Sequence, residues 1–220
     1  MNTQEKWHEM HSQKRHQPRY PSSDLVAFVL KNFKTNDQIL DLGCGGGRHV
    51  KFLAENDFIA YGVDYSKNGI KATRELLDLH KLKAELKIAS VDDIPYEDEK
   101  FDGVICYGVL YYNPIELIEK AAKEIHRILK KDGVAYIVVR STKDYRYVNN
   151  EKISKYEVLV NENDISKSAF KENGMKMYFF DKDEVKRMFS NFRQIEINSI
   201  KISYINDSFA DENFVVILRK

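Results

Sequence analysis

Short apolar runs alternate with helical repeats along most of the chain. Five apolar runs have the length and composition of buried strands, and they are Gln38–Leu42, Phe58–Asp64, Ala84–Ser90, Phe101–Gly108 and Val134–Arg140. Between them, apolar residues recur at three- and four-residue spacing, which predicts helices at Gly47–Glu55, Ser66–His80 and Pro114–Gly133. This alternation is typical of an α/β fold with a mostly parallel sheet, covered by helices on both faces.

The rhythm changes after the fifth run. Residues 141–176 are polar, rich in Lys, Asn and Tyr, and have no clear period. A helix is predicted near Asp181–Phe189, and two β-rich runs, FRQIEINSI and NFVVILRK, predict a closing hairpin. We expect one domain over residues 1–220, in which segment 141–178 is an insertion over the strand ends, where such folds place binding sites.

Composition narrows the class of protein. The 220 residues include 35 Lys and Arg against 34 Asp and Glu, so the formal net charge is +1 and no basic field points to nucleic acid. No apolar run approaches the length of a membrane span, and the first residues lack the apolar core of a secretion signal. Two cysteines are too few for a disulfide scaffold, and a reduced, cytoplasmic setting is expected.

The stretch ILDLGCGGGRHV, residues 39–50, carries four glycines within five positions between a predicted strand and a predicted helix. A phosphate-binding P-loop is excluded, because no Lys-Ser or Lys-Thr follows the glycines. Gly43 and Gly45 fit a dinucleotide fingerprint, but its third glycine position holds Arg48. In addition, Asp41 would lie close to a pyrophosphate and repel it.

A third ligand, S-adenosylmethionine, suits these acids better. It has no phosphate, carries a positive sulfonium and a positive ammonium, and has a ribose diol. Asp41 can attract the ammonium, directly or through water, and Asp64 at the end of the second strand can accept hydrogen bonds from the ribose hydroxyls. Glycines let the backbone approach such a ligand closely.

Two longer stretches carry a family resemblance. ILDLGCGGGRHVKFLAENDFIAYGVDYS resembles the first motifs of the class I S-adenosylmethionine-dependent methyltransferases, and the segment from Ala89 to Val139 resembles their later motifs. The resemblance implies a Rossmann-like, seven-stranded sheet with an antiparallel last strand, and S-adenosyl-L-methionine as the cofactor. It also implies that residues 1–24 form a lid that includes Arg19 and Tyr20. The cofactor-binding residues carried over are Tyr20, Asp41, Gly43, Gly45, Asp64, Tyr65, Ser90, Val91, Asp92, Cys106 and Tyr107.

The acceptor side is less well defined by sequence. Tyr107, Tyr111 and Tyr112 lie at and after the fourth strand, where related enzymes often place a histidine, and are candidate catalytic residues. If the acceptor must lose a proton, the base is expected from His11, His16 or Asp144. The substrate-binding candidates are Arg48, Tyr112, Arg140, Lys143, Tyr145 and Arg146, whose arginines and lysine suit a phosphate or carboxylate.

Some roles stay open at this point. Arg48 suits the cofactor carboxylate, the acceptor, or an exposed first helical turn, and His49 suits either the cofactor pocket or a helix surface. We expect methyl transfer to an oxygen or nitrogen of a small polar metabolite, including phosphorylated or nucleotide-linked sugars. The expected partners are a small-molecule acceptor only, with no metal, nucleic acid or membrane, in a monomer or homodimer. The alternatives are a non-catalytic cofactor-binding subunit and a methyltransferase acting on protein or tRNA.

Overall fold

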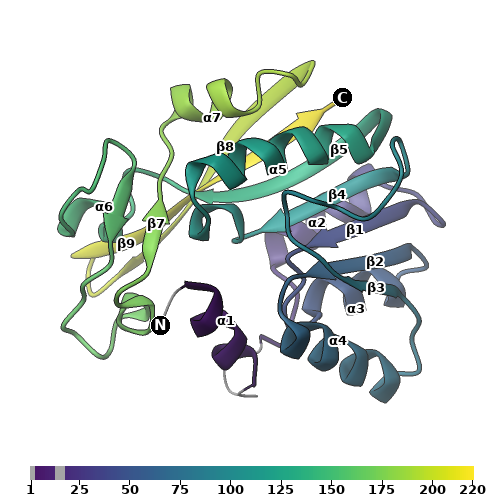
Figure 1. The fold of residues 1–220 in the computed structure, drawn as a ribbon, viewed down its shortest axis with the longest axis horizontal. Helices are drawn as coiled ribbons and strands as arrows, with labels where there is room; N and C mark the ends of the chain where they lie inside the picture. The colour runs from purple at the N-terminus through teal and green to yellow at the C-terminus, as the bar shows by residue number, and fades with distance from the viewer. Residues whose placement is uncertain (1–2, 13–17) are drawn as a thin grey trace.

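A seven-stranded sheet runs through the centre of the molecule in a computed structural model that describes residues 3–12 and 18–220, with side chains for 5–10 and 18–220. Its strands are β1 (Gln38–Leu42), β2 (Ile59–Asp64), β3 (Glu85–Ile88), β4 (Phe101–Tyr107), β5 (Leu129–Arg140), β8 (Gln194–Tyr204) and β9 (Phe209–Arg219). Their order is β3-β2-β1-β4-β5-β9-β8 (Figure 1). The first five strands in this order are parallel, and β9 is antiparallel to both β5 and β8, so the predicted fold is confirmed.

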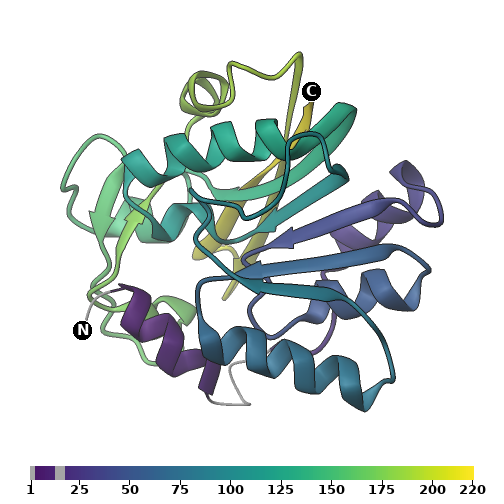
Figure 2. The same ribbon diagram turned by 45° about the vertical axis from the view of Figure 1, so that its right-hand side comes forward.

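Helices cover both faces of the sheet because successive strand residues point to opposite sides. Leu40 and Leu42 of β1 pack into one buried cluster, whereas Ile39 packs into the other. Figure 2 shows α5 and α4 on opposite sides of the sheet. The helices are α1 (Thr3–Ser12), α2 (Ser23–Asn32), α3 (Arg48–Glu55), α4 (Lys67–Leu79), α5 (Ile115–Ile128) and α7 (Lys182–Met188). Helices α2, α3 and α4 lie on one face, α5 and α7 on the other, and α1 packs beside α4.

One predicted helix is shorter than its local pattern indicates. The helix predicted over Pro114–Gly133 ends at Ile128, and β5 begins at Leu129. Leu129 is fully buried and pairs with Phe101 of β4. Because of this pairing, the chain adopts the extended conformation of a strand from Leu129 onward. Lys130, expected at the helix end, therefore belongs to the sheet. Non-local strand pairing overrides helix propensity here.

The irregular segment 141–178 forms ordered structure at one end of the sheet (Figure 1). It contains α6 (Tyr145–Asn149), β6 (Glu157–Leu159), the short 3-10 helix η3 (Ser168–Glu172) and β7 (Lys176–Tyr178). β6 and β7 pair as a small antiparallel sheet, and β7 contacts the 3-10 turn η2 (Leu110–Tyr112) that follows β4. The insertion thus reaches the carboxyl ends of the central strands. Within the described residues, no helix is long and apolar enough to span a lipid bilayer.

Gly103 of β4 tests how closely the residue after α2 packs against the sheet. A Cβ atom at this position would lie 2.5 Å from the ring of Phe33, the residue just after α2. We expect Gly103→Ala to lower the free energy of unfolding by about 1–3 kcal/mol, the usual cost of overpacking. Urea denaturation measures the change. The double variant Gly103→Ala/Phe33→Leu, in which the opposing ring is removed, should recover part of that loss; no recovery would contradict the explanation.

Candidate active site

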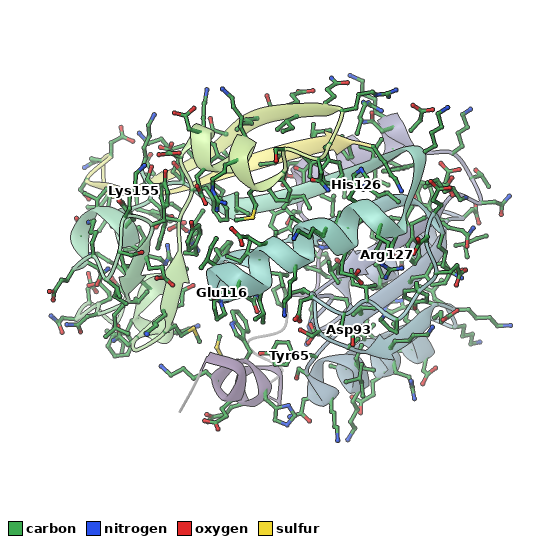
Figure 3. All side chains as sticks on the ribbon, turned by 45° about the horizontal axis from the view of Figure 1, so that its top comes forward. Tyr65, Asp93, Glu116, His126, Arg127 and Lys155 are labelled. Carbon is green, nitrogen blue, oxygen red and sulfur yellow. The ribbon has the colours of Figure 1, made fainter. Side chains whose placement is uncertain are left out.

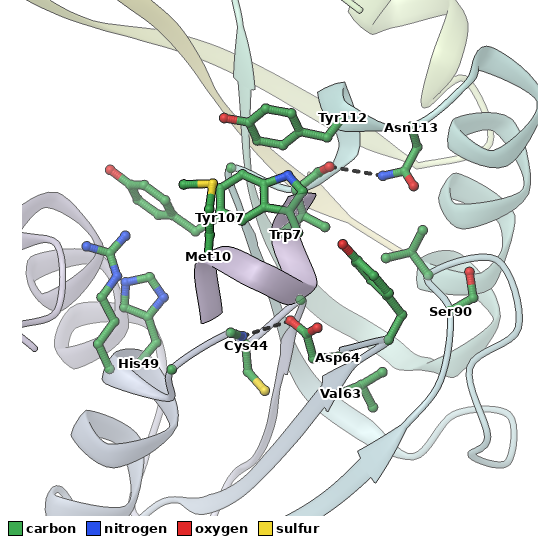
Figure 4. A pocket seen from close by; sticks show the side chains of 18 of the residues that line it. Trp7, Met10, Cys44, His49, Val63, Asp64, Ser90, Tyr107, Tyr112 and Asn113 are labelled. Carbon is green, nitrogen blue, oxygen red and sulfur yellow. Dashed lines mark hydrogen bonds between the residues drawn. The ribbon is translucent and has the colours of Figure 1, made fainter. Parts of the chain in front are cut away.

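A cavity of about 330 Å³ opens at the edge where the carboxyl ends of β1, β2, β3 and β4 meet (Figure 4). Ligands of open parallel sheets bind at this edge. Residues far apart in sequence line the cavity: the glycine loop, the ends of β2 and β3, the turn after β4, and α1. The predicted site residues that line it are Gly43, Gly45, Arg48, Asp64, Tyr65, Ser90, Val91, Tyr107, Tyr111 and Tyr112. Their contacts with a donor or an acceptor stay predictions.

The first turn of the glycine loop is fixed by a hydrogen bond to β2 and by close packing against the loop after β4. Gly43 has a φ of 78°, in the left-handed region that favours glycine, and its N–H donates to the Val63 carbonyl at 2.7 Å. A Cβ atom on Gly43 would lie 2.4 Å from a methyl carbon of Val109. Only a glycine therefore lets the loop after β1 pack this closely against the loop after β4.

Asp64, at the end of β2, connects the glycine loop to α4. One carboxylate oxygen accepts a hydrogen bond from the Gly45 N–H and the other from the Ser66 N–H, both at 2.8 Å. The Ser66 hydroxyl in turn accepts from the Gly69 N–H and caps α4. These bonds fix the carboxylate at the cavity wall, where it can accept hydrogen bonds from a ribose diol.

Asp41 lies beneath the glycine loop and is only 2% exposed. One of its oxygens has no hydrogen-bond partner among the described residues, and the other lies 3.7 Å from Nδ1 of His49. A buried carboxylate oxygen without a partner is costly, so it fits a ligand that brings a cation, such as the ammonium of S-adenosylmethionine. The residues present therefore suit this cofactor.

His49 is 3% exposed and lines the cavity, so the helix-surface alternative is wrong. Its Nε2 accepts a long hydrogen bond of 3.5 Å from the Ser22 N–H, and its ring lies 5.3 Å from that of Tyr107. The burial of His49 at the cavity was difficult to predict from the sequence, since a histidine in a first helical turn is usually exposed. Together with Asp41, His49 forms a buried pair beneath the glycine loop.

Four of the predicted cofactor residues do not line the cavity, and they are Tyr20, Asp41, Asp92 and Cys106. Cys106 is fully buried beneath the end of β4, and burial raises the pKa of its thiol, so it serves as a core residue. Asp92 accepts a short hydrogen bond from the Ser90 hydroxyl instead of facing the cavity itself. Ser90 remains in the wall at the end of β3, held in place by Asp92.

Four large aromatic side chains line one part of the cavity, and Figure 4 labels three of them, Trp7, Tyr107 and Tyr112; the fourth is Tyr111. Trp7 of α1 meets Tyr112 edge to face at 4.9 Å, and Tyr112 lies 4.5 Å from Tyr111. Tyr107 forms the side next to Arg48. Met10 of α1 also lines this region. We refer to Trp7, Tyr107, Tyr111 and Tyr112 as the aromatic wall.

The three tyrosines of this wall are neutral hydrogen-bond donors. Burial raises the pKa of the Tyr107, Tyr111 and Tyr112 hydroxyls above the ordinary value, so none of them ionises near neutrality. The Tyr112 hydroxyl donates to Glu172 of η3 at 2.6 Å. Their chemistry is therefore to position a ligand and exclude water, not to act as a base.

The predicted clamp for an acceptor anion is corrected by the structure. The Arg146 guanidinium is 1% exposed and binds Asp144, Glu172 and Asp211. Arg140 is also buried and binds Asp144 at 2.7 Å. Neither arginine lines the cavity. Three carboxylates of the chain neutralise both cations, and Asp144, fixed in these ion pairs, is unsuited to be a general base.

Other predicted residues lie elsewhere. Lys143 is exposed, and Tyr145 is buried with its hydroxyl accepting from the Ala169 N–H. Tyr20, expected over the cofactor, is 81% exposed and does not line the cavity. The structure describes the backbone of His11 in α1 but not its side chain, and His16 lies outside the described residues.

Helix α1 forms the outer wall of the cavity and was not predicted as a helix. Lys6 donates to the Asn173 carbonyl of the insertion, and the His8 ring lies within hydrogen-bond distance of the Ser66 hydroxyl at 3.3 Å. The helix thus bridges the insertion and the start of α4, and Figure 3 places Tyr65 beside it. Trp7, the single tryptophan of the chain, is the residue that could have indicated this packing, because a lone aromatic in a polar segment needs a packing partner.

Comparison with known proteins agrees with this geometry. Residues 40–137 match the family model described as a methyltransferase domain. A solved S-adenosylmethionine-dependent methyltransferase from Methanosarcina mazei superimposes with a TM-score of 0.71 at 20% identity, covering 91% of this chain and 98% of that one. This likeness shows the fold.

Several curated relatives carry names that state an activity, and two of these names differ in the acceptor. The ubiquinone biosynthesis O-methyltransferase of Pelagibacter ubique is 28% identical over 50% of this chain and 48% of its own length. The tRNA U34 carboxymethyltransferase of Campylobacter lari is 29% identical over 52% of this chain and 37% of its own length. The chain spans about half the length of the curated relatives it matches, and the two names point to different acceptors.

Replacing Asp64 tests the donor side of the cavity. Asp64→Asn removes one acceptor oxygen and the negative charge, and a hydrogen bond to a charged group contributes about 1.5–3 kcal/mol. We expect at least tenfold weaker binding of S-adenosylhomocysteine by calorimetry. The control is Asp93→Asn, an exposed aspartate of the next loop (Figure 3), which should bind as the parent does. Equal affinity in the two variants would remove Asp64 from the donor site.

Replacing Arg146 tests whether the buried arginines serve structure. Arg146→Met leaves the carboxylates of Asp144 and Glu172 without their partner, and such a loss in a buried network costs about 3–5 kcal/mol of folding stability. Urea denaturation should show this loss. The exposed neighbour Lys143→Met should change stability by less than about 0.5 kcal/mol. A stable Arg146→Met protein would show that the network contributes little to the fold.

Proposed function

We propose that this chain, which carries a class I S-adenosylmethionine-dependent methyltransferase domain, transfers a methyl group from S-adenosylmethionine to an oxygen or nitrogen of a small-molecule acceptor. In that transfer the bond between sulfur and the methyl carbon breaks while the bond to the acceptor atom forms. The electron pair stays on sulfur, and the proton that the acceptor loses ends in the bulk solvent outside the cavity. The protein supplies alignment and a site from which water is excluded.

The observation that carries the small-molecule proposal is the enclosure of the cavity by α1. Trp7 and Met10 stand across its outer side, and their helix is bonded to both the insertion and α4. A volume of about 330 Å³ is at the lower end of the range for small-ligand sites, and donor and acceptor must share it. A folded RNA or a protein loop would require α1 to leave.

The charges of the chain narrow the range of acceptors expected from the sequence. Because Arg140 and Arg146 are neutralised within the protein, they do not support a phosphorylated acceptor. An RNA acceptor, as the names of two relatives imply for those relatives, would be favoured by a basic surface, and the chain has a formal net charge of only +1. We therefore place the small-molecule acceptor first.

A labelling experiment tests the proposal. The protein is incubated with S-adenosylmethionine carrying a radioactive methyl group and, separately, with the small-molecule, RNA and protein fractions of a bacterial extract. We expect label in the small-molecule fraction, and the Asp64→Asn variant should transfer at least tenfold less, because its donor affinity falls. Label transferred mainly to RNA or protein would replace the small-molecule acceptor with a macromolecule. Donor binding without transfer to any fraction would favour a non-catalytic subunit.

A further inference from the structure

Arg48 is the one permanent cation among the described residues that line the cavity. Its guanidinium stacks over the Tyr107 ring at 5.3 Å and makes one long hydrogen bond of 3.5 Å to the Tyr20 carbonyl. No carboxylate of the described residues lies within ion-pair distance of it, in contrast to the two arginines of the insertion. Half-buried beside this ring, it presents donors that suit a carboxylate.

Two acidic side chains flank the glycine loop. Asp64 is fixed at the end of β2, and Asp41 lies below the loop, 3.7 Å from the ring of His49. These two acids suit a cationic donor at the glycine loop, whereas Arg48 is a cation beside Tyr107 of the aromatic wall.

The aromatic wall itself favours a flat apolar group. Trp7, Tyr111 and Tyr112 are packed against one another, so their faces and edges have fixed positions. Fixed aromatic surfaces bind planar rings by offset or edge-to-face contact, and the thioether of Met10 is suited to the same contact.

From these observations we infer that the acceptor is a planar aromatic compound that carries a carboxylate. The ring lies against the aromatic wall, and the carboxylate binds Arg48. This inference rests on the proposed function, and it names the substrate class of the same cavity. The carboxylate of the donor is the competing occupant of Arg48, and the test separates the two.

The test uses protein saturated with S-adenosylhomocysteine and four probes of similar size. 4-Hydroxybenzoate carries the ring and the anion, 4-hydroxybenzamide is neutral, 4-hydroxybenzylamine is cationic, and cyclohexanecarboxylate has the anion without the aromatic ring. Calorimetry gives each Kd, and the fluorescence of Trp7, the single tryptophan, reports whether the probe reaches the wall. We expect 4-hydroxybenzoate to bind at least tenfold more tightly than the other three.

Variants of Arg48 complete the experiment. Arg48→Gln should remove the preference for the carboxylate, and Arg48→Lys, which keeps the charge but loses the planar fork, should retain part of it. Arg74→Gln, an exposed arginine of α4, is the matched control and should behave as the parent does. Thermal melting checks that each variant is folded.

Three results would overturn the inference. The first is equal or tighter binding of any of the other three probes, and the second is a carboxylate preference that survives Arg48→Gln. The third is a loss of S-adenosylhomocysteine affinity in Arg48→Gln with probe selection unchanged, which would assign Arg48 to the donor carboxylate. In each case S-adenosylhomocysteine still binds the parent protein, so the proposed function would stand. Failure of the parent to bind S-adenosylhomocysteine would instead reject the proposed function.

Discussion

The carboxylate of Asp64 is the constraint on which the rest of the site depends. It accepts one backbone N–H from the glycine loop and one from the start of α4, so two loops from different strands are fixed by one side chain. Hydrogen bonds to an ionised acceptor are the stronger kind. The same carboxylate places negative charge at the wall where we propose that the cationic donor binds, so loop geometry and the proposed donor preference share one cause.

The buried arginines of the insertion and the half-buried Arg48 show how burial decides the role of a cation. Arg146 is removed from water, and its charge is tolerated only because Glu172 and two aspartates surround it. Through Glu172 this network also receives the Tyr112 hydroxyl, so the insertion holds one ring of the aromatic wall in position. Arg48 has no such carboxylates among the described residues and remains able to bind a ligand. The same residue type thus serves structure in one place and, in our proposal, recognition in the other.

Sequence predicted the features that local patterns control. Strand runs, the glycine loop and Asp64 at a strand end are set by neighbours within a few residues, and the sheet follows from them. The end of α5 could not be predicted in this way, because pairing of Leu129 with Phe101 decides it. Nor could the neutralisation of Arg146, whose partners Glu172 and Asp211 come from distant segments. The role of a charged residue could not be predicted from the sequence where its partners lie far along the chain.

Helix α1 links the two halves of the cavity physically. It bonds to the insertion through Lys6 and to the cap of α4 through His8, while Trp7 between them touches Tyr112. Each such hydrogen bond contributes only about 0.5–1.5 kcal/mol, so displacing α1 costs far less than unfolding the sheet. Because α1 contacts the start of α4 at Ser66 and the aromatic wall at Tyr112, one helix borders the cavity from the end of β2 to the turn after β4.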